Sequence, residues 1–229
     1  MFSMYSLSWF LLAMNIQYYG DFCFKITTKP GGRATDDVVV VIDPCEKETG
    51  LRAPQGQVDL VLKTHTSEKD RDLAEETLLF DDPGEYDVRG IPIFGLPSFR
   101  DDDHGAIRGK NTIFVLQSED ITLCHLGALG HELPLATIEK LGHIDILFVP
   151  VGNKDTLVIG KIDELIRKIE PAMVVPMHYK FPGFATESED MTAFCKEVGN
   201  CPETAIPKIS LKKKDLDGKS MEVVLLERA

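Results

Sequence analysis

Three stretches of this sequence decide its fold: DILFVPVG at residues 145–152, VVPMHYK at residues 174–180, and HLGALGH at residues 125–131. The first two are apolar runs that end in glycine, histidine or lysine, and the third directly follows such a run. Short apolar runs bounded by turn residues are typical of strands covered on both faces. Such strands form sheets with helices packed outside, so these stretches predict an α/β domain.

Further short apolar runs predict strands on either side of these stretches, mainly in the first half of the chain. The clearest are Ile16–Ile26, Val38–Ile42, Val58–Leu62, Ile91–Phe94, Thr112–Leu116, Ile121–His125, Ile144–Pro150, Ala172–Met177 and Met221–Leu226. Helical spacing of apolar residues predicts helices over Leu133–Leu141, Ile159–Ile169 and Glu187–Val198, the last capped by Thr186. With no repeat or linker, one domain of stacked sheets with outer helices is expected.

Composition excludes some classes of function. The chain has 229 residues, of which 43% are hydrophobic, enough for one large domain with a real core. Its formal net charge of −12 argues against nucleic-acid binding, which needs clustered basic residues. The basic run Lys212–Lys214 indicates a solvated strand end or turn. Five cysteines without a CxxC pair indicate a reducing compartment, so a cytoplasmic protein is expected, with Cys124 as a small buried hydrophobe.

The N-terminal segment MFSMYSLSWFLLAM, residues 1–14, is apolar and carries no charged side chain. It has no basic region or cleavage site of a signal peptide, and it is too short to span a bilayer. We interpret residues 1–13 as a tail or an over-extended start and residues 14–229 as the domain. A membrane anchor is the second interpretation.

Four loops at predicted strand ends carry polar residues that plain connections do not need, and loops of this kind often hold function. They are Val61–Asp70 with His65, Pro97–Asn111 with Arg100, His125–His131, and the end of Val174–Lys180 with His178.

In order and spacing these loops resemble the metallo-β-lactamase superfamily. Further motifs agree: YYGDFCFKI at 18–26, Asp43-Pro44, DPGEYDVRGIPIFG at 82–95 and RGKNTIFVL at 108–116. The chain is most similar to the zinc-dependent hydrolases of β-lactamase fold that include ascorbate-6-phosphate lactonase. The resemblance covers the chain from Met14 onward. It implies an α/β (α+β) fold, a four-layer αββα sandwich with the site at one edge between the sheets.

The resemblance also implies metal ligands, and the first ligand loop has lost most of them. The family pattern after the strand is H-x-H-x-D-H. Aligned on His65, the second histidine position holds Ser67, the aspartate position holds Lys69 and the last histidine position holds Asp70. Only His65 matches, although Asp70 could still coordinate a metal.

The remaining ligand positions lie in the other three loops. The next family histidine falls on Arg100, the bridging aspartate falls on Ala128, and the final histidine is retained as His178. The residual ligands implied by the resemblance are therefore His65, Asp70 and His178.

These replacements remove the chemistry of a dinuclear zinc centre. A catalytic zinc takes about three protein ligands and keeps one open position. Ala128 has no donor atom with which to bridge two metals. Lys69 and Arg100 would place positive charges beside a divalent cation. Lys69 also stands where the family has the aspartate that orients the attacking water.

Two explanations of Lys69 and Arg100 stay open. In the first, their charges replace that of the metal, and they form salt bridges with Asp70 and Asp101 that hold the loops together. In the second, they result from drift after loss of function, and both side chains point to solvent.

The other polar residues of these loops have simpler interpretations. His104 and His131 are not at family ligand positions, and His125 and His143 are interpreted as structural. The Asp101–Asp103 run indicates a solvated loop. The glycines of HLGALGH are expected where the backbone needs a positive φ or close packing.

Three functions follow from these patterns. The leading one is a metallo-β-lactamase-fold hydrolase homologue that is inactive as a zinc hydrolase and serves in binding or scaffolding, without a cofactor. The alternative is a mononuclear hydrolase that uses zinc or manganese on a phosphorylated or lactone-like small molecule. The third is an anion-binding module that uses Lys69, Arg100 and Lys180. The expected partner is a small molecule or anion, or a second copy of the chain.

Overall fold

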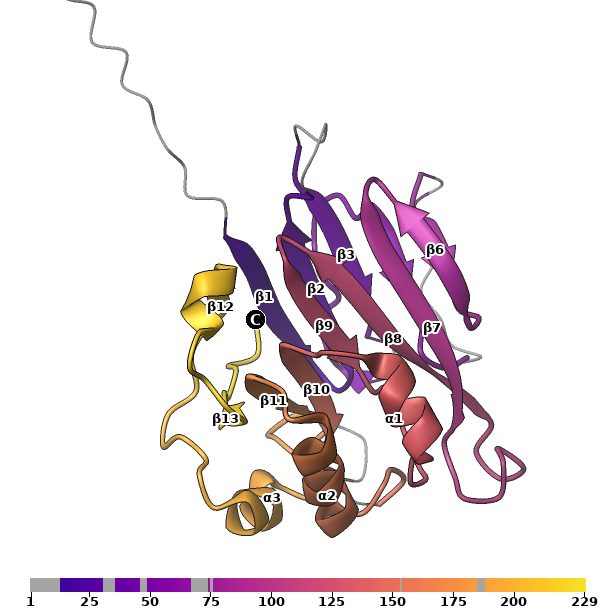
Figure 1. Cartoon of the computed structure of the whole chain (residues 1–229), viewed down its shortest axis with the longest axis vertical. Coiled ribbons are helices and arrows are strands. Elements are labelled where there is room, and N and C mark those ends of the chain that lie inside the picture. The colour runs from indigo at the N-terminus through magenta and orange to yellow at the C-terminus, as the bar shows by residue number, and fades with distance from the viewer. Residues whose placement is uncertain are drawn as a thin grey trace, which may run out of the picture.

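Two mixed β-sheets stacked face to face form the centre of the protein (Figure 1). The computed structural model describes residues 13–30, 36–45, 49–66, 74, 76–152, 154–184 and 188–229. The first sheet has the order β12-β1-β2-β3-β4-β5. Its strands are β1 Met14–Gly20, β2 Cys23–Thr28, β3 Val38–Ile42, β4 Leu60–Leu62, β5 Leu78–Phe80 and β12 Ile209–Leu211.

The second sheet has the order β13-β11-β10-β9-β8-β7-β6. Its strands are β6 Gly84–Val88, β7 Ile91–Phe99, β8 Lys110–Ser118, β9 Ile121–His125, β10 Ile146–Pro150, β11 Met173–Met177 and β13 Glu222–Val223. Strands β9, β10, β11 and β13 run parallel, so the carboxyl ends of the first three lie at the same edge of the sheet. All five residues of β10 are buried, as expected for a strand covered on both faces.

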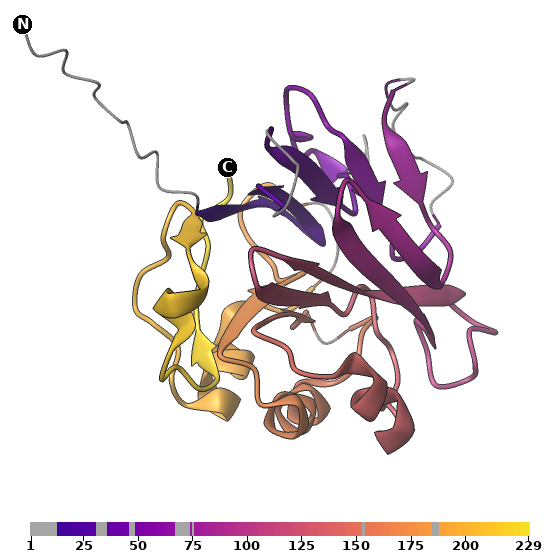
Figure 2. The same cartoon turned by 45° about the horizontal axis from the view of Figure 1, so that its top comes forward.

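The helices α1 Leu135–Leu141, α2 Ile159–Ile169 and α3 Met191–Val198 lie outside the second sheet (Figure 2). Helix α2 is amphipathic and buries Ile159, Ile162, Leu165 and Ile166. A short 3-10 helix, η2, covers Lys213–Leu216. In the described part of the chain, the outer face of the first sheet is covered by irregular segments that include Leu51 and Phe184. The predicted α+β sandwich is confirmed.

Apolar side chains fill the space between the sheets. In β1 every second residue is buried, so Met14, Ile16 and Tyr18 point into this core. A second core between the β9–β11 strands and the helices contains Leu147, Val149 and residues of α2. The sandwich is therefore held together mainly by burial of apolar surface.

Several predicted boundaries were wrong. The run Ile16–Ile26 is two strands, because Asp21 and Phe22 form a turn in which Asp21 has a φ of 56°. The third helix begins at Met191 instead of Glu187, because the Asp190 side chain accepts a hydrogen bond from the Thr192 N–H and caps it. The predicted cap Thr186 lies outside the described residues. Strands β5 and β12 have only three residues each, and β6, with the sequence GEYDV, is mostly polar, so none of them forms an apolar run that stands out in the sequence.

Cys195 and Cys201 form a disulfide at the end of α3, which their spacing did not predict. Cys124 is buried in β9, as predicted. Within the described ranges, every helix is too short or too polar to cross a membrane. The interpretation of residues 1–13 stays a prediction, since residues 1–12 lie outside the described part. The cytoplasmic location also stays a prediction, and the disulfide does not agree with the reducing compartment on which it was based.

Candidate functional site

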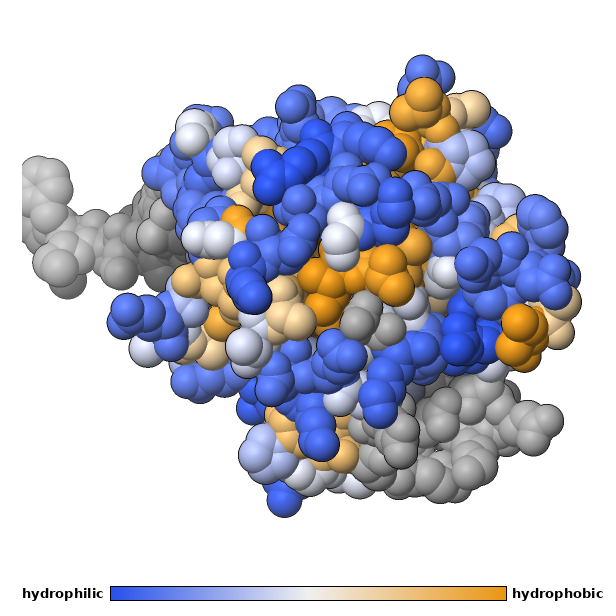
Figure 3. Space-filling view, turned by 90° about the horizontal axis from the view of Figure 1, so that it is seen from below, coloured by the Kyte–Doolittle hydropathy of each residue, from blue (hydrophilic) through white to orange (hydrophobic). Residues whose placement is uncertain are grey.

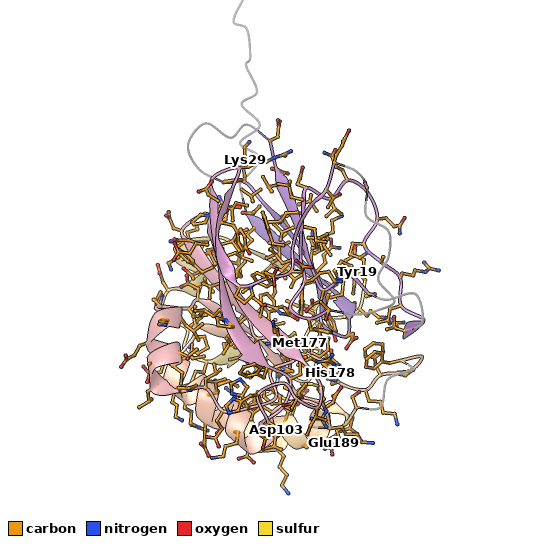
Figure 4. The ribbon with its side chains drawn as sticks, turned by 90° about the vertical axis from the view of Figure 1, so that its right-hand side faces the viewer. Tyr19, Lys29, Asp103, Met177, His178 and Glu189 are labelled. Carbon is orange, nitrogen blue, oxygen red and sulfur yellow. A yellow bond between two sulfur atoms is a disulfide. The ribbon has the colours of Figure 1, made fainter. Side chains whose placement is uncertain are left out.

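The polar loops picked out in the sequence meet at one end of the sandwich. Figure 4 places Met177 and His178 near this end, together with Asp103 and Glu189, whereas Lys29 lies at the opposite end. Seen from outside, apolar residues gather near the middle of this end, and polar residues surround them (Figure 3). The parallel strands β9, β10 and β11 direct their following loops here, which explains why distant motifs converge.

His178 lies at the centre of this end, directly after β11. Its side chain is 2% exposed, and its ring stacks on Phe22 with centroids 4.2 Å apart. Nδ1 lies 2.5 Å from Oδ1 of Asp21, and Nε2 lies 2.9 Å from Oδ1 of Asp155. Because a carboxylate accepts hydrogen bonds, each ring nitrogen donates a proton, and the ring is an imidazolium. We call Asp21, His178 and Asp155 the His178 cluster.

The charges in this cluster stabilise one another. Burial by itself would lower the pKa of His178, but the hydrogen bonds from Asp155 and Asp21 outweigh it and raise the pKa to about 9. Burial likewise opposes ionisation of Asp155, yet the hydrogen bond and charge of His178, with the charge of Arg100, lower the pKa of Asp155 below its usual value. His178 and Asp155 are therefore both charged at neutral pH.

His65 is different, because it is neutral. The Thr64 hydroxyl donates to Oδ2 of Asp43 at 2.6 Å, so Nδ1 of His65 donates to that hydroxyl at 2.9 Å. This tautomer leaves the lone pair on Nε2. Burial, together with the nearby charge of Arg100, lowers the pKa of His65 to about 3. Burial raises the pKa of Asp43 to about 7, although both hydrogen bonds from Thr64 act against that shift.

The HLGALGH loop is fixed by Asn111 of β8. The amide of Asn111 donates to the Leu126 carbonyl at 2.9 Å, and its oxygen accepts from the N–H of Ala128 at 2.9 Å. Gly127 has a φ of +60°, and a Cβ there would lie 2.4 Å from Oδ1 of Asn111. The predicted role of this glycine in backbone geometry is confirmed.

Arg100 approaches the same loop through its backbone. A Cβ on Gly130 would lie 2.0 Å from the carbonyl oxygen of Arg100, so only glycine fits. Nε of Arg100 is buried and has no hydrogen-bond partner. Its charge lies near enough to Asp155 and His65 to lower the pKa of each. The positive charge of Arg100 therefore favours the ionised form of Asp155 and the neutral form of His65.

Asp101 does not pair with Arg100, contrary to the salt-bridge hypothesis. Its carboxylate accepts hydrogen bonds from four backbone N–H groups, at distances from 2.6 to 3.2 Å. These belong to Asp103, Gly105, Ile107 and Arg108. Asp101 is 2% exposed and organises its own loop, because four N–H donors satisfy the acceptor capacity that a salt bridge would use.

The other histidines act structurally. Nε2 of His125 donates to the Phe22 carbonyl at 3.0 Å, while Nδ1 accepts from the Gly127 N–H. Nε2 of His131 accepts from the Phe99 N–H at 3.2 Å, and His143 contacts Asp145. His104 packs its ring edge against Phe99.

Comparison with known proteins agrees with this architecture. The beta-lactamase superfamily domain matches residues 15–178, which include both β-sheets up to His178. The chain belongs to the beta-lactamase superfamily.

Relatives in this superfamily are similar over part of their length. A UPF0173 metal-dependent hydrolase from Methanopyrus kandleri is 24% identical over 129 residues, which are 54% of this chain and 56% of that protein. Another from Staphylothermus marinus is 30% identical over 103 residues, 45% of this chain and 44% of that protein. The chain thus matches about half the length of these curated relatives.

Solved structures are similar over nearly the whole chain. One is a candidate Zn-dependent hydrolase of the metallo-beta-lactamase superfamily from Thermotoga maritima, with 27% identity and a TM-score of 0.70. The alignment covers 93% of this chain and 98% of that one. Igni18, a metallo hydrolase from Ignicoccus hospitalis, shares the fold at 18% identity and a TM-score of 0.61, over 95% of this chain and 96% of that one.

Few of the predicted metal-ligand positions offer a free donor atom in the described residues. His65 has a free lone pair on Nε2, whereas both nitrogens of His178 face carboxylates. Ala128 is buried and has no donor atom, and Arg100 is a cation. Ser67, Lys69 and Asp70 lie outside the described residues. Within the described part, no three His, Cys, Asp or Glu side chains are grouped for metal binding. The described residues at these positions therefore supply one free imidazole nitrogen, that of His65, whereas a catalytic zinc takes about three protein ligands.

Sequence reasoning missed Asp21 and Asp155. Asp21 lies within the YYGDFCFKI motif, in what was predicted to be a single strand. Asp155 follows the DILFVPVG motif by three residues. The available signals were an acidic residue inside the apolar run Ile16–Ile26 and another shortly after the predicted strand Ile144–Pro150. Lys180, of the predicted anion-binding set, is exposed, and its N–H donates to the Glu189 carbonyl.

Proposed function

We propose that this chain is a beta-lactamase superfamily protein that does not act as a zinc hydrolase and serves in binding or scaffolding. The observation that carries the proposal is the His178 cluster. A histidine binds a metal through a lone pair, and both nitrogens of His178 instead donate to Asp21 and Asp155, at 2.5 and 2.9 Å.

Arg100 gives independent support. Its charge lies near Asp155 and His65, so it occupies the surroundings of the former metal site. A cation there repels a divalent metal. The salt bridge expected between Arg100 and Asp101 is therefore replaced in this proposal: the His178 imidazolium, paired with Asp21 and Asp155, supplies positive charge, and the nearby charge of Arg100 adds to it.

The rival function is a mononuclear hydrolase with His65, Asp70 and His178 as ligands. The relatives named metal-dependent hydrolases favour it. It requires a neutral His178 whose Nε2 releases Asp155 on metal binding.

Metal analysis separates the two. The full chain is purified without chelators, supplied with zinc and then with manganese, and its metal content is measured after gel filtration. We expect far less than one equivalent. About one tightly bound equivalent, the content that a catalytic site needs, would contradict the proposal.

A restoration variant provides the positive control. It combines Ser67→His, Lys69→Asp, Asp70→His, Arg100→His and Ala128→Asp. We expect zinc uptake by this variant and none by the parent. The matched control keeps Ala128 and changes the other four positions, and it should bind less zinc because the bridging carboxylate is missing.

A further inference from the structure

Three buried polar side-chain atoms in the described ranges have no hydrogen-bond partner: Nε of Arg100, Oγ1 of Thr156 and Oγ of Ser188. Thr156 is 7% exposed and Ser188 is 5% exposed. A buried polar atom without a partner is costly, and such atoms are rare in native proteins. Unpartnered donors therefore point to something that binds them.

All three lie around the His178 cluster. Thr156 follows Asp155 directly, and the Leu157 N–H donates to the Leu129 carbonyl, which holds this segment against the HLGALGH loop. The position of a Cβ on Gly152 would be 2.9 Å from Cδ2 of His178 and 3.0 Å from Cβ of Ser188. Ser188 therefore lies beside the His178 ring.

Arg100 completes the arrangement from another loop. Its carbonyl oxygen lies against Gly130, and the Gly130 N–H donates to the Phe99 carbonyl, directly after the Leu129 whose carbonyl holds Leu157. Three chain segments that are far apart in sequence, at Arg100, Thr156 and Ser188, are thus packed around the His178 cluster, and each carries a buried polar atom without a partner. The chemistry shared by these groups is hydrogen-bond donation to oxygen, strongest from the guanidinium to an anion.

We propose that Arg100, Thr156 and Ser188 bind a small oxyanion, a phosphate or carboxylate group, beside the His178 cluster. The inference rests on the proposed function, because it requires a site without a metal. A planar guanidinium matches the oxygens of either group, and the hydroxyls donate to the remaining oxygens. The cluster itself has one net negative charge, from two carboxylates and one imidazolium, and Arg100 offsets it, so these four groups together carry no net charge.

Thermal unfolding of the metal-free full chain tests the proposal. Inorganic phosphate, acetate and chloride are titrated at matched ionic strength, and the two oxyanions distinguish the phosphate and carboxylate sources. We expect a saturable rise in Tm with phosphate or acetate but not with chloride. Arg100→Gln should weaken the apparent affinity about tenfold or more, as for loss of a charged hydrogen bond.

Further variants show which groups bind. Thr156→Val and Ser188→Ala should each weaken the affinity about two- to tenfold, as for a neutral hydrogen bond. Arg100→Lys keeps the charge but loses the planar fork, so it tests the site if Arg100→Gln fails to fold. The control Arg167→Gln removes an equal charge from the exposed surface of α2 and should leave the affinity unchanged.

Failure of the anion site and failure of the proposed function give different results in these experiments. No saturable response in the parent, or one that persists in Arg100→Gln and in the Thr156→Val and Ser188→Ala variants, overturns the anion site. In that case ordered water is what satisfies these atoms. Metal content of the same sample decides the proposed function. A zinc-containing parent whose phosphate response still needs Arg100 would overturn the loss of metal binding and leave the anion site standing.

Discussion

The groups around a histidine decide what its ring can do. The resemblance predicts His178 as the last metal ligand, and in the structure hydrogen bonds with Asp21 and Asp155 engage both of its nitrogens. Residue identity records only that an imidazole is present. The proton on each nitrogen depends on what faces it. At the scale of one residue, chemistry therefore follows the surroundings of the ring.

Gly130 makes a prediction at the same scale. Gly130→Ala should lower the free energy of unfolding by at least about 2 kcal/mol, because the new Cβ would overlap the Arg100 carbonyl and force the two loops apart. Urea denaturation measures the change.

The matched control is Gly160→Ala in α2, where a Cβ would meet no atom within 4 Å. This change should raise the free energy of unfolding by about 0.5–1 kcal/mol, because alanine loses less backbone entropy in a helix. Equal effects of the two variants would contradict the close-packing explanation.

Loops are the elements that build the site, and Asp101 shows how one of them is held. The segment between β7 and β8 has no regular structure, yet four of its N–H groups donate to one carboxylate. A carboxylate with several N–H donors can organise a loop much as a cap organises a helix end.

Asp101→Asn should therefore loosen this loop. Four backbone hydrogen bonds outweigh the effect of burial and lower the pKa of Asp101, so their contribution is present above the ordinary carboxyl pKa and is lost as the pH falls. Hydrogen exchange at Asp103, Gly105, Ile107 and Arg108 should be at least about tenfold faster in the variant. Exposed Asp102→Asn is the control, and similar exchange in both variants would exclude this role.

The C-terminal elements make another prediction. Nζ of Lys213, in η2, lies 2.7 and 2.8 Å from the two oxygens of buried Asp145. The basic run interpreted as solvated therefore contains one structural residue. Lys213→Met should lower the free energy of unfolding by roughly 1–3 kcal/mol, because it removes the ammonium group from a buried carboxylate and leaves only the exposed His143 ring and the Thr122 N–H beside it.

Lys214→Met changes an exposed neighbour and should have an effect within about 0.5 kcal/mol. Thermal and urea unfolding of the pair decide the matter. A Lys213 variant as stable as the Lys214 variant would show that the ion pair contributes little.

The His178 cluster joins parts of the whole molecule. Asp21 belongs to the turn between β1 and β2 of the first sheet, while His178 and Asp155 follow β11 and β10 of the second. The two sheets are thus connected through charged groups at the end where a superfamily metal site would lie. Stability of the sandwich should depend on the protonation of His178.

The raised pKa of His178 decides the direction in which the free energy of unfolding changes with pH. Since the pKa of His178 is about 9 in the folded protein and about 6.5 in an unfolded chain, its contribution is complete below about pH 6.5. It is lost as the pH rises through about 9. Its size is on the order of 3 kcal/mol, by linkage.

Urea unfolding at pH 6.5, 8 and 9.5 measures this dependence. Asp155→Asn should reduce the loss of stability between pH 6.5 and 9.5, because one of the two groups that raise the pKa is gone. Exposed Glu164→Gln is the control and should follow the parent. An unchanged profile in Asp155→Asn would mean that the cluster does not set the pH dependence.

Much of the fold was predictable. Runs such as Ile121–His125 and Val38–Ile42 matched their strands, and Ile159–Ile169 matched α2, because their patterns of apolar residues are local and strong. The run Ile16–Ile26 was misread as one strand, since the Asp21–Phe22 turn is lined on both sides by apolar residues. The strands β5 and β12 have three residues each and form by pairing with neighbours, which no local pattern encodes.

The sequence by itself determined the superfamily, the strands that carry the four loops, and the absence of donor atoms at Ala128 and of a metal ligand at Arg100. These follow from residue identity and order. Only the tertiary structure decided the partners of His178, because Asp21 and Asp155 are 157 and 23 residues away along the chain. Hydrogen bonds and charge interactions depend on distance in space, and folding alone brings these three side chains within reach of one another.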